Sequence, residues 1–421
     1  MKLVEQHIIK QSNSNYKKLE QLTMLSANLY NSAIFTIRQH YFNRKGKQYI
    51  EDICSNIDYD YVNYYELNRV FKLNNQQDYR SLPINVSQEV LKQVDLTFKS
   101  FFKLLKLKQS NNYSKPVKLP HYKKKNSKNL IVLNCSTLSK NNTSFKIPKT
   151  DIVIDNIIHL NTAKQIRIIP KLNYFVLEVV YEAKEDKTKP DNNRYLSIDM
   201  GVNNLAACTS NIINSFIING RPIKSINQYY NKKSSKLQSN LELINKTKTS
   251  KKLRLLSLKR NNKIKWYLHH SSKYIIDICV QNNINTIIIG KNDGWKQNIN
   301  IGVKNNQTFV SIPFNILVQQ IKYKSKLKGI NIIEQEESYT SKVSFLDNDF
   351  IPVYGKSDNK FNPSGKRINR GLYQTKENHY INADINGSLN ILRKYLNVAS
   401  NFIIGERSRG FVVNPYIITF K

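Results

Sequence analysis

The sequence predicts a mixed α/β chain in two parts: helices with a β-barrel or sheet first, then an α/β domain. Apolar residues recur at helical spacing between Asn85 and Lys108, whereas residues 116–182 show the short alternating runs that are typical of antiparallel strands. After Arg194, strand-like and helix-like segments alternate, as in a sheet covered by helices. A chain of 421 residues is long enough for two or three domains.

The first part begins with a predicted strand at 1–10 and a helix at 15–45. A polar, Tyr-rich connection is expected up to about residue 80, followed by the amphipathic helix, whose apolar stripe we assign to packing in the core. The strands expected next are 130–133, 144–147, 165–169 and 174–181. They form an antiparallel barrel or sheet to which the strand at 1–10 can be added, and residues 184–193 are expected to be a linker.

The second part contains a recognisable order of elements. The expected strands are 195–200, 204–209, 213–219, 285–290 and 330–335. The expected helices are 223–246, 249–283, 313–328 and a last one that starts near Asp384 and runs through Arg393. Three antiparallel strands, a helical stretch and then strand–helix–strand is the order of a ribonuclease-H-like domain.

The composition indicates a nucleic-acid partner. The chain has 66 Lys and Arg against 30 Asp and Glu, a formal net charge of +36, which a polyanion would neutralise. The four cysteines form no CxxC pair, so neither a zinc ribbon nor a disulfide framework is expected. With no signal-peptide core and no apolar run long enough for a membrane span, a soluble intracellular protein is expected.

Carboxylates at the ends of predicted strands are the candidate catalytic groups. Asp199 ends an apolar run, and Asp384 precedes the last predicted helix, 185 residues later. An aspartate in that position can simply cap the helix, which is the alternative for Asp384. Carboxylates that converge from separate elements hold two Mg²⁺ ions in phosphodiester cleavage, and Mn²⁺ suits the same ligands.

The third ligand is expected from the strand at 330–335. The strand next to the first ends at Gly290 rather than at a glutamate, and Asp293 beyond it lies in an Asp-Gly turn. Glu336 and Glu337 follow the later strand. Since successive strand residues point to opposite faces, only one of them can face the site, and we favour Glu337.

Two basic segments are candidates for contacts with nucleic acid. Residues 221–265 contain 14 Lys and Arg and one acid, Glu242, which favours a helical arm along a phosphate backbone over a merely solvated face. Lys366, Arg367 and Arg370 lie in a Gly-flanked segment, 364–373, which is expected to be either a mobile loop that touches phosphates or an ordinary surface loop.

At these residues the chain resembles TnpB, the insertion-sequence-encoded protein related to type V CRISPR effectors. The segments that carry the resemblance are 197–205, 339–341 and 384–392. Weaker likeness is found at 82–102, 119–123 and 165–182, so that it covers most of the chain. Each motif alone is weak, but their order is fairly specific.

The resemblance implies an RNA-guided DNA endonuclease of a transposable element, which cuts target DNA beside a short adjacent motif. It implies four parts: a wedge-like, OB-like β-barrel, a helical recognition (REC) insertion, a RuvC-like nuclease and a target-nucleic-acid-binding insertion without zinc ligands. Their expected ranges are 1–14 with 112–190, 15–111, 191–340 with 379–421, and 341–378, respectively. The expected partners are a guide RNA of the omega type and double-stranded DNA, with no membrane.

The resemblance also implies the site residues. Asp199, Glu337 and Asp384 would hold Mg²⁺, with Glu336 as the alternate ligand. Nucleic-acid contacts are expected at Lys123, Lys124, Lys125, Trp295, Lys296, Lys366, Arg367 and Arg370. A prokaryotic protein in the cytoplasm, on the nucleoid when bound to DNA, is expected.

Two departures from the family pattern matter. The family usually carries a cysteine zinc module between its second and third motifs, but this chain has no cysteine after Cys279, so no zinc is expected. The usual glutamate position is Gly290, and the resemblance implies that the later strand supplies the carboxylate. Gly290 also leaves open a nuclease-dead, RNA-guided DNA-binding protein such as a repressor; an unguided RuvC-type resolvase is the third reading.

Overall fold

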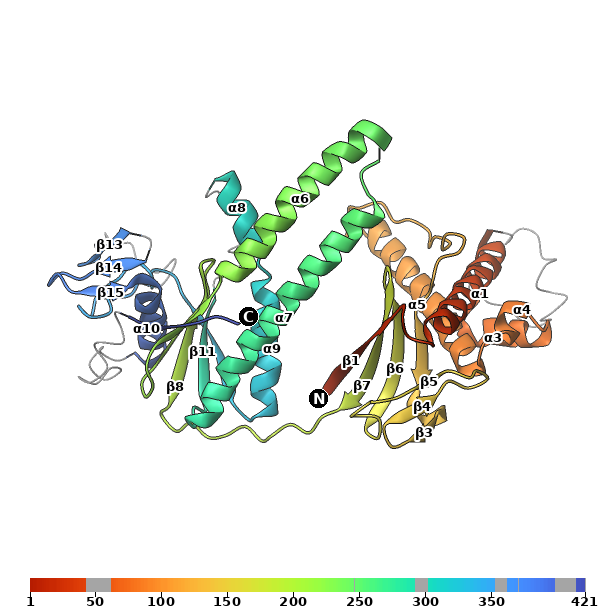
Figure 1. The fold of residues 1–421 in the computed structure, drawn as a ribbon, viewed down its shortest axis with the longest axis horizontal. Coiled ribbons are helices and arrows are strands. Elements are labelled where there is room, and N and C mark those ends of the chain that lie inside the picture. Colours follow the sequence, from red (N-terminus) through yellow and green to blue (C-terminus); the bar gives the residue numbers. More distant parts are fainter. Residues whose placement is uncertain are drawn as a thin grey trace. The chain divides into compact units, whose positions relative to one another are not determined.

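The computed structural model describes residues 1–42, 62–245, 247–291, 302–352, 362–369, 371–397 and 414–420. These residues fold into two compact units, Met1–Ala183 and Lys184–Lys421 (Figure 1). The finer four-part layout expected from the sequence stays a prediction. Within the described ranges, no helix is both long and apolar enough to cross a membrane.

The helices of the first unit are α1 (Tyr16–Phe42), α3 (Tyr64–Leu73), α4 (Gln77–Arg80) and α5 (Ile84–Gln109). The long helices α1 and α5 agree with the expectation, and the stripe of α5 is buried as predicted. The expected connection up to residue 80 is wrong over 64–80, which holds two short helices. A capping box formed by Asn63 and Glu66 starts α3. The apolar face of this helix is buried and consists of Leu67, Val70 and Phe71.

The strands of the first unit form two open sheets. The larger contains β1 (Lys2–Lys10), β7 (Tyr174–Glu182), β6 (Ala163–Pro170) and β2 (Ile131–Asn134), in that order. The smaller contains β3 (Ser139–Asn141), β4 (Ser144–Lys146) and β5 (Val153–Ile154). The expected barrel is therefore not closed among the described residues: β1 pairs with β7 and β2 with β6, and the short strands β3–β5 pair with one another instead of joining the edges.

The second unit is built on a six-stranded sheet of order β12-β11-β8-β9-β10-β16. Its strands are β8 (Tyr195–Asp199), β9 (Asn204–Ser210), β10 (Phe216–Asn219), β11 (Thr286–Lys291), β12 (Asn331–Glu336) and β16 (Tyr416–Ile418). Strands β8, β9 and β10 form an antiparallel meander, and β11 and β12 run parallel to β8. Five of these strands were expected, whereas the edge strand β16 was not.

Helices cover the two faces of this sheet. One face packs against α7 (Lys251–Gln281) and α9 (Phe314–Leu327), which share a core with Leu196, Ile198 and Ile289. The other packs against α10 (Ala383–Leu396), whose Leu389, Ile391 and Leu392 are buried with Tyr195 and Ile288. Burial of such a side chain stabilises a fold by about 1.5–3 kcal/mol. Two further helices are α6 (Arg221–Asn245), which forms a long hairpin with α7, and the unexpected α8 (Val303–Val310) (Figure 1).

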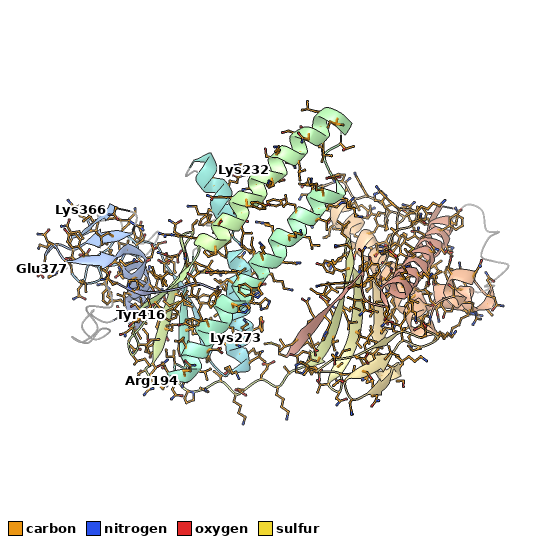
Figure 2. All side chains as sticks on the ribbon, in the orientation of Figure 1. Arg194, Lys232, Lys273, Lys366, Glu377 and Tyr416 are labelled. Atoms are coloured by element: carbon orange, nitrogen blue, oxygen red, sulfur yellow. The ribbon has the colours of Figure 1, made fainter. Side chains whose placement is uncertain are left out.

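The segment before α10 forms a small antiparallel sheet of β13 (Lys366–Asn369), β14 (Leu372–Gln374) and β15 (Tyr380–Asn382). Both expectations of a loop at 364–373 are wrong, because most of this segment pairs as strands. Tyr373 anchors the sheet: it is 1% exposed, and its hydroxyl donates to the Lys342 carbonyl at 2.9 Å. Glu377 lies at the tip of the sheet, away from α10 (Figure 2).

Candidate active site

Asp199 is the last residue of β8 and faces α10. Alternation along the strand puts it on the same side as Ser197, whose hydroxyl donates to the Ser388 carbonyl of α10 at 2.7 Å. Gly387 makes room for the carboxylate, since a Cβ on this residue would lie 2.7 Å from Asp199 Oδ2. The α10 face of the sheet at this strand end is therefore the place where the candidate groups meet.

Glu337 directly follows the last residue of β12 and reaches the same face. The parallel pairing of β8 and β11 ends at Ile198 with Ile289, so Gly290 follows on β11 where Asp199 follows on β8. A Cβ on Gly290 would collide with Glu337 Oε2 and would lie 2.6 Å from Ile391 Cδ1. The carboxylate of Glu337 thus fills the space directly above the glycine.

Glu336 is directed elsewhere. Its carboxylate forms an ion pair with Lys394 and accepts a hydrogen bond from the Ser338 N–H at 2.6 Å. Burial opposes its ionisation, but these hydrogen bonds outweigh burial and lower the pKa of Glu336. The two neighbouring glutamates therefore have different surroundings, as the alternation of a strand requires.

Asp384 is the second residue of α10 and does not cap it. The cap is Asn382, whose side chain accepts from the backbone N–H groups of Asp384 and Ile385. The Asp384 carboxylate instead accepts from Asn204 Nδ2 at 2.5 Å and forms an ion pair with Arg367 Nη2 at 3.2 Å. Its oxygens are thus directed away from the helix backbone.

A buried hydroxyl network fixes α10 on the sheet. Ser197, Thr209 and Ser388 are fully buried and hydrogen-bond to one another at 2.6–3.0 Å. Each hydroxyl is satisfied in a place where an unpaired polar group would cost about 1–3 kcal/mol. The network joins β8, β9 and α10 directly beneath Asp199.

Two asparagines of α10 hold the loop that follows Glu337. Asn386 accepts from the Phe345 N–H at 3.0 Å and donates to the Val343 carbonyl at 2.8 Å. Asn390 donates to the carbonyls of Thr340 and Val343 at 2.9 and 3.0 Å. Both side chains are fully buried, so the helix that carries Asp384 also positions the loop that begins at Glu337.

The electrostatics show that these carboxylates interact. Burial raises the pKa of Asp199 well above its ordinary value, and the negative charges of Glu337 and Asp384 raise it further, against smaller opposing effects of Arg367 and the Met200 N–H. Burial, with a smaller effect of Glu336, raises the pKa of Glu337 to about 7. Groups that repel each other in this way are stabilised by a nearby cation.

The donor set fits a divalent metal in chemistry but is not a ready-made cage. Carboxylate oxygens are the ligands that Mg²⁺ and Mn²⁺ prefer. In the part of the chain that the structure describes, however, no three His, Cys, Asp or Glu side chains are grouped closely enough to hold an ion. The Asp384 carboxylate is also held by two neighbours, Asn204 and Arg367.

A cleft of about 700 Å³ opens beside Asp384. Arg221, Arg367, Asn203, Asn204 and Asn369 line it together with Asp384. Two guanidinium groups and three side-chain amides next to a carboxylate form a surface that suits a phosphate backbone.

The predicted nucleic-acid contacts are found in different places. Lys366 and Arg367 lie on β13. Lys124 and Lys125 are exposed in the first unit, whereas Lys123 is half-buried with its ammonium 4.5 Å from the Tyr30 ring centroid. Trp295, Lys296 and Arg370, as well as Asp293, lie outside the described residues.

The sequence analysis missed the residues that support the carboxylates. Asn204, Asn386, Asn390 and Ser388 were quoted in the motifs but received no role. For the two asparagines of α10, the sequence does contain a signal. Residues 386 and 390 are four apart and therefore lie on one helix face, and polar residues amid apolar ones on such a face indicate buried hydrogen bonds.

Comparisons with known proteins identify two matching families. The family described as OrfB_IS605, probable transposase, matches residues 178–296. A family described as Cas12f1-like, TNB domain, matches residues 314–391. Together these ranges include Asp199, Glu337 and Asp384.

A curated relative matches most of the chain, and two solved structures are also similar to it. The TnpB-like protein ORF457 of Acidianus two-tailed virus is 23% identical over 452 residues, covering 94% of this chain and 87% of the relative. The cryo-EM structure of a Cas12f1-sgRNA-target DNA complex covers 89% of this chain and 82% of its own, with 14% identity and a TM-score of 0.49. The structure of the mini-RNA-guided endonuclease CRISPR-Cas_phi3 covers 93% of this chain and 92% of its own, with 12% identity and a TM-score of 0.42.

Proposed function

Because the chain belongs to the TnpB family, we propose that it is an RNA-guided DNA endonuclease of a transposable element. It cleaves target DNA next to a short adjacent motif by two-metal-ion hydrolysis. Its family relationship supports a nuclease of transposon origin, and the arrangement of its own carboxylates supports the chemistry.

The observation that carries the proposal is the carboxylate of Glu337 above Gly290. In a ribonuclease-H-like domain, the strand beside the first commonly ends in a glutamate. Here that strand ends without one, yet the neighbouring strand delivers a carboxylate to the same place beside Asp199. On this basis Asp199, Glu337 and Asp384 are the metal ligands, and Glu336 is a structural partner of Lys394.

The residues of the chain have defined tasks in this mechanism. Asp199, Glu337 and Asp384 would hold Mg²⁺ or Mn²⁺, which activates water and stabilises the leaving oxygen of a phosphodiester. Asn204 orients the Asp384 carboxylate through its 2.5 Å hydrogen bond. Arg221, with Asn203 and Asn369 in the same cleft, binds the backbone of the strand to be cut.

The partners proposed are a guide RNA and double-stranded target DNA. The net charge of +36 and the exposed lysines of α6 and α7, such as Lys232 and Lys265, suit a phosphate backbone. The first unit would serve as the wedge and recognition parts, and 341–378 as a target-binding insertion that needs no zinc. The protein would act in the prokaryotic cytoplasm, on the nucleoid.

The competing proposal is a nuclease-dead, RNA-guided DNA-binding protein. The lack of a ready-made cage among the described residues favours it, because the Asp384 carboxylate is held by Arg367 and Asn204. An unguided resolvase is the third proposal. Cleavage and the RNA that accompanies the protein distinguish the three.

The decisive experiment expresses the chain with its native flanking DNA, sequences the co-purified RNA and measures Mg²⁺-dependent cutting of a matching plasmid beside randomised flanks. We expect one defined RNA and cleavage that D199N, D384N and E337Q each reduce by more than the roughly 10- to 100-fold that changes around metal ligands cost. E336Q is the matched control and should keep most activity. Exchange of the two positions in G290E/E337G should restore part of what E337G loses.

Other outcomes decide against the proposal. A defined RNA with target binding but no cutting would establish the nuclease-dead protein. Cutting without any discrete RNA would establish the resolvase. Equal loss in E336Q and E337Q would contradict the assignment of Glu337.

A further inference from the structure

Arg367 forms an ion pair with Asp384, one of the proposed metal ligands. Its guanidinium therefore occupies a carboxylate oxygen that a metal ion would need. Arg367 Nη2 lies 3.2 Å from Asp384 Oδ1, while Oδ2 accepts the hydrogen bond of Asn204. Both oxygens of the carboxylate are therefore engaged. A metal ion bound to Asp384 would stand next to a guanidinium of the same charge.

The fold builds this contact. Arg367 is opposite Tyr373 in the β13–β14 pairing, and Tyr373 is opposite Ile381 in the β14–β15 pairing. Strand β15 ends at Asn382, and Asp384 follows two residues later in α10. The buried Tyr373 anchors the sheet, so that Arg367 is held near Asp384 by paired strands.

The contact is also weak enough to be exchanged. The side chains of Arg367 and Asp384 are 41% and 29% exposed. Ion pairs in contact with solvent are worth about 0–1 kcal/mol, far less than buried ones. The same arginine lines the cleft beside Asp384, where a phosphate group can accept two parallel hydrogen bonds from a guanidinium.

We propose that Arg367 is a resting counter-ion that occupies Asp384 and weakens metal binding until a nucleic-acid phosphate in the cleft draws it away. Arg367 is then a positioning residue that couples metal loading to the presence of DNA. This inference rests on the proposed function, because it takes Asp384 as a metal ligand. It also fits the finding that, among the described residues, no three His, Cys, Asp or Glu side chains form a ready-made cage.

The test titrates the DNA-free full-length protein with Mn²⁺ and measures free Mn²⁺ by electron paramagnetic resonance. R367Q should bind Mn²⁺ about five-fold more tightly than the wild type, the change that an ion pair of about 1 kcal/mol gives. R367K keeps the charge and should stay near the wild type. K366Q, on the neighbouring residue of the same strand, is the control and should also be unchanged, and D199N should lose the site.

A second titration adds a single-stranded DNA of target sequence with phosphorothioate linkages, which resist hydrolysis. The ratio of the R367Q and wild-type affinities should fall toward one, because the wild-type arginine has then left Asp384. Equal Mn²⁺ affinity of R367Q and wild type without DNA, with binding still lost in D199N, would overturn the inference alone. Absence of D199N-sensitive Mn²⁺ binding from both proteins would overturn the proposed metal site and the inference with it.

Discussion

At the scale of single residues, Gly290 and Glu337 form a pair whose meaning depends on both. A glycine at the end of a central strand suggests a lost ligand when read alone. The structure shows that the missing side chain is what admits the Glu337 carboxylate. Glu336, one residue earlier, is engaged by Lys394 and provides a natural control for every test of Glu337.

The raised pKa of Glu337 predicts how the stability of the second unit depends on pH without metal. A carboxyl whose pKa rises from 4.5 in the unfolded chain to about 7 binds more protons when folded. Its contribution to stability is therefore fully present below pH 4.5 and is lost as pH rises through 7. The loss amounts to about 3 kcal/mol at most, and the raised pKa of Asp199 acts in the same direction.

Urea unfolding in EDTA between pH 5 and 8 measures this effect. Trp266 lies on α7 in the second unit, so tryptophan fluorescence reports on the unfolding of this unit. E337Q should lose less free energy of unfolding than the wild type as the pH rises. E336Q should keep the wild-type dependence, and an identical decline in E337Q would contradict the assignment of the shift to Glu337.

At the scale of elements, α10 carries Asp384 and fixes the loop after Glu337 through Asn386 and Asn390. The existence of this helix and of five strands of the large sheet could be predicted from apolar periodicity, because long periodic segments are the strongest signal in a sequence. Strands β13–β15 and β16 could not, since they are only three or four residues long. Their pairing depends on neighbours that are distant in the chain.

The candidate site, like the fold, could be predicted from the sequence only in part. Asp199 and Asp384 stand out because they adjoin strongly patterned elements. Alternation along a strand means that Glu336 and Glu337 point to opposite faces, but which of them faces the site follows only once the register of the strand is known. The contacts of Arg367 and Asn204 with Asp384 join positions 17 and 180 residues away, which no local pattern reveals.

Loss of the Asn386 side-chain hydrogen bonds should weaken the second unit. N386L leaves the buried Phe345 N–H without its acceptor, and we expect a loss of about 1–3 kcal/mol in the free energy of unfolding. Limited proteolysis should then cut the loop at 338–346 faster than in the wild type. N331A, at an exposed position of β12, should change stability by less than about 0.5 kcal/mol; if N386L is equally neutral, the loop is held by other contacts.

At the scale of the whole molecule, the charge of +36 is the dominant property. A chain with 66 basic and 30 acidic residues repels itself in the absence of a polyanion. Many exposed basic residues lie on the α6–α7 hairpin. On α6 they include Lys232 (Figure 2), Lys233 and Lys236. We therefore expect the compact form of the protein to be coupled to the nucleic acid proposed as its partner.

This coupling predicts a steep dependence of DNA binding on salt. Between 50 and 200 mM NaCl, the affinity of the RNA-free protein for duplex DNA should fall by about 1,000-fold or more, because each neutralised phosphate releases counter-ions. Fluorescence anisotropy at several salt concentrations gives the slope of log K against log salt. K232Q/K233Q/K236Q should reduce that slope by about 2–3, whereas a fall of less than ten-fold in the wild type would contradict a charge-driven interface.

The space above Gly290 also constrains how such a site can evolve. A glutamate at both 290 and 337 would crowd one volume, and a small residue at both would leave it without a carboxylate. Any path of single substitutions between the two arrangements therefore crosses a variant that is either strained or empty. The two positions are epistatic, so a comparison that scores each alignment column separately would count this chain as inactive. A comparison that asks which side chain occupies the volume would count its carboxylate as present.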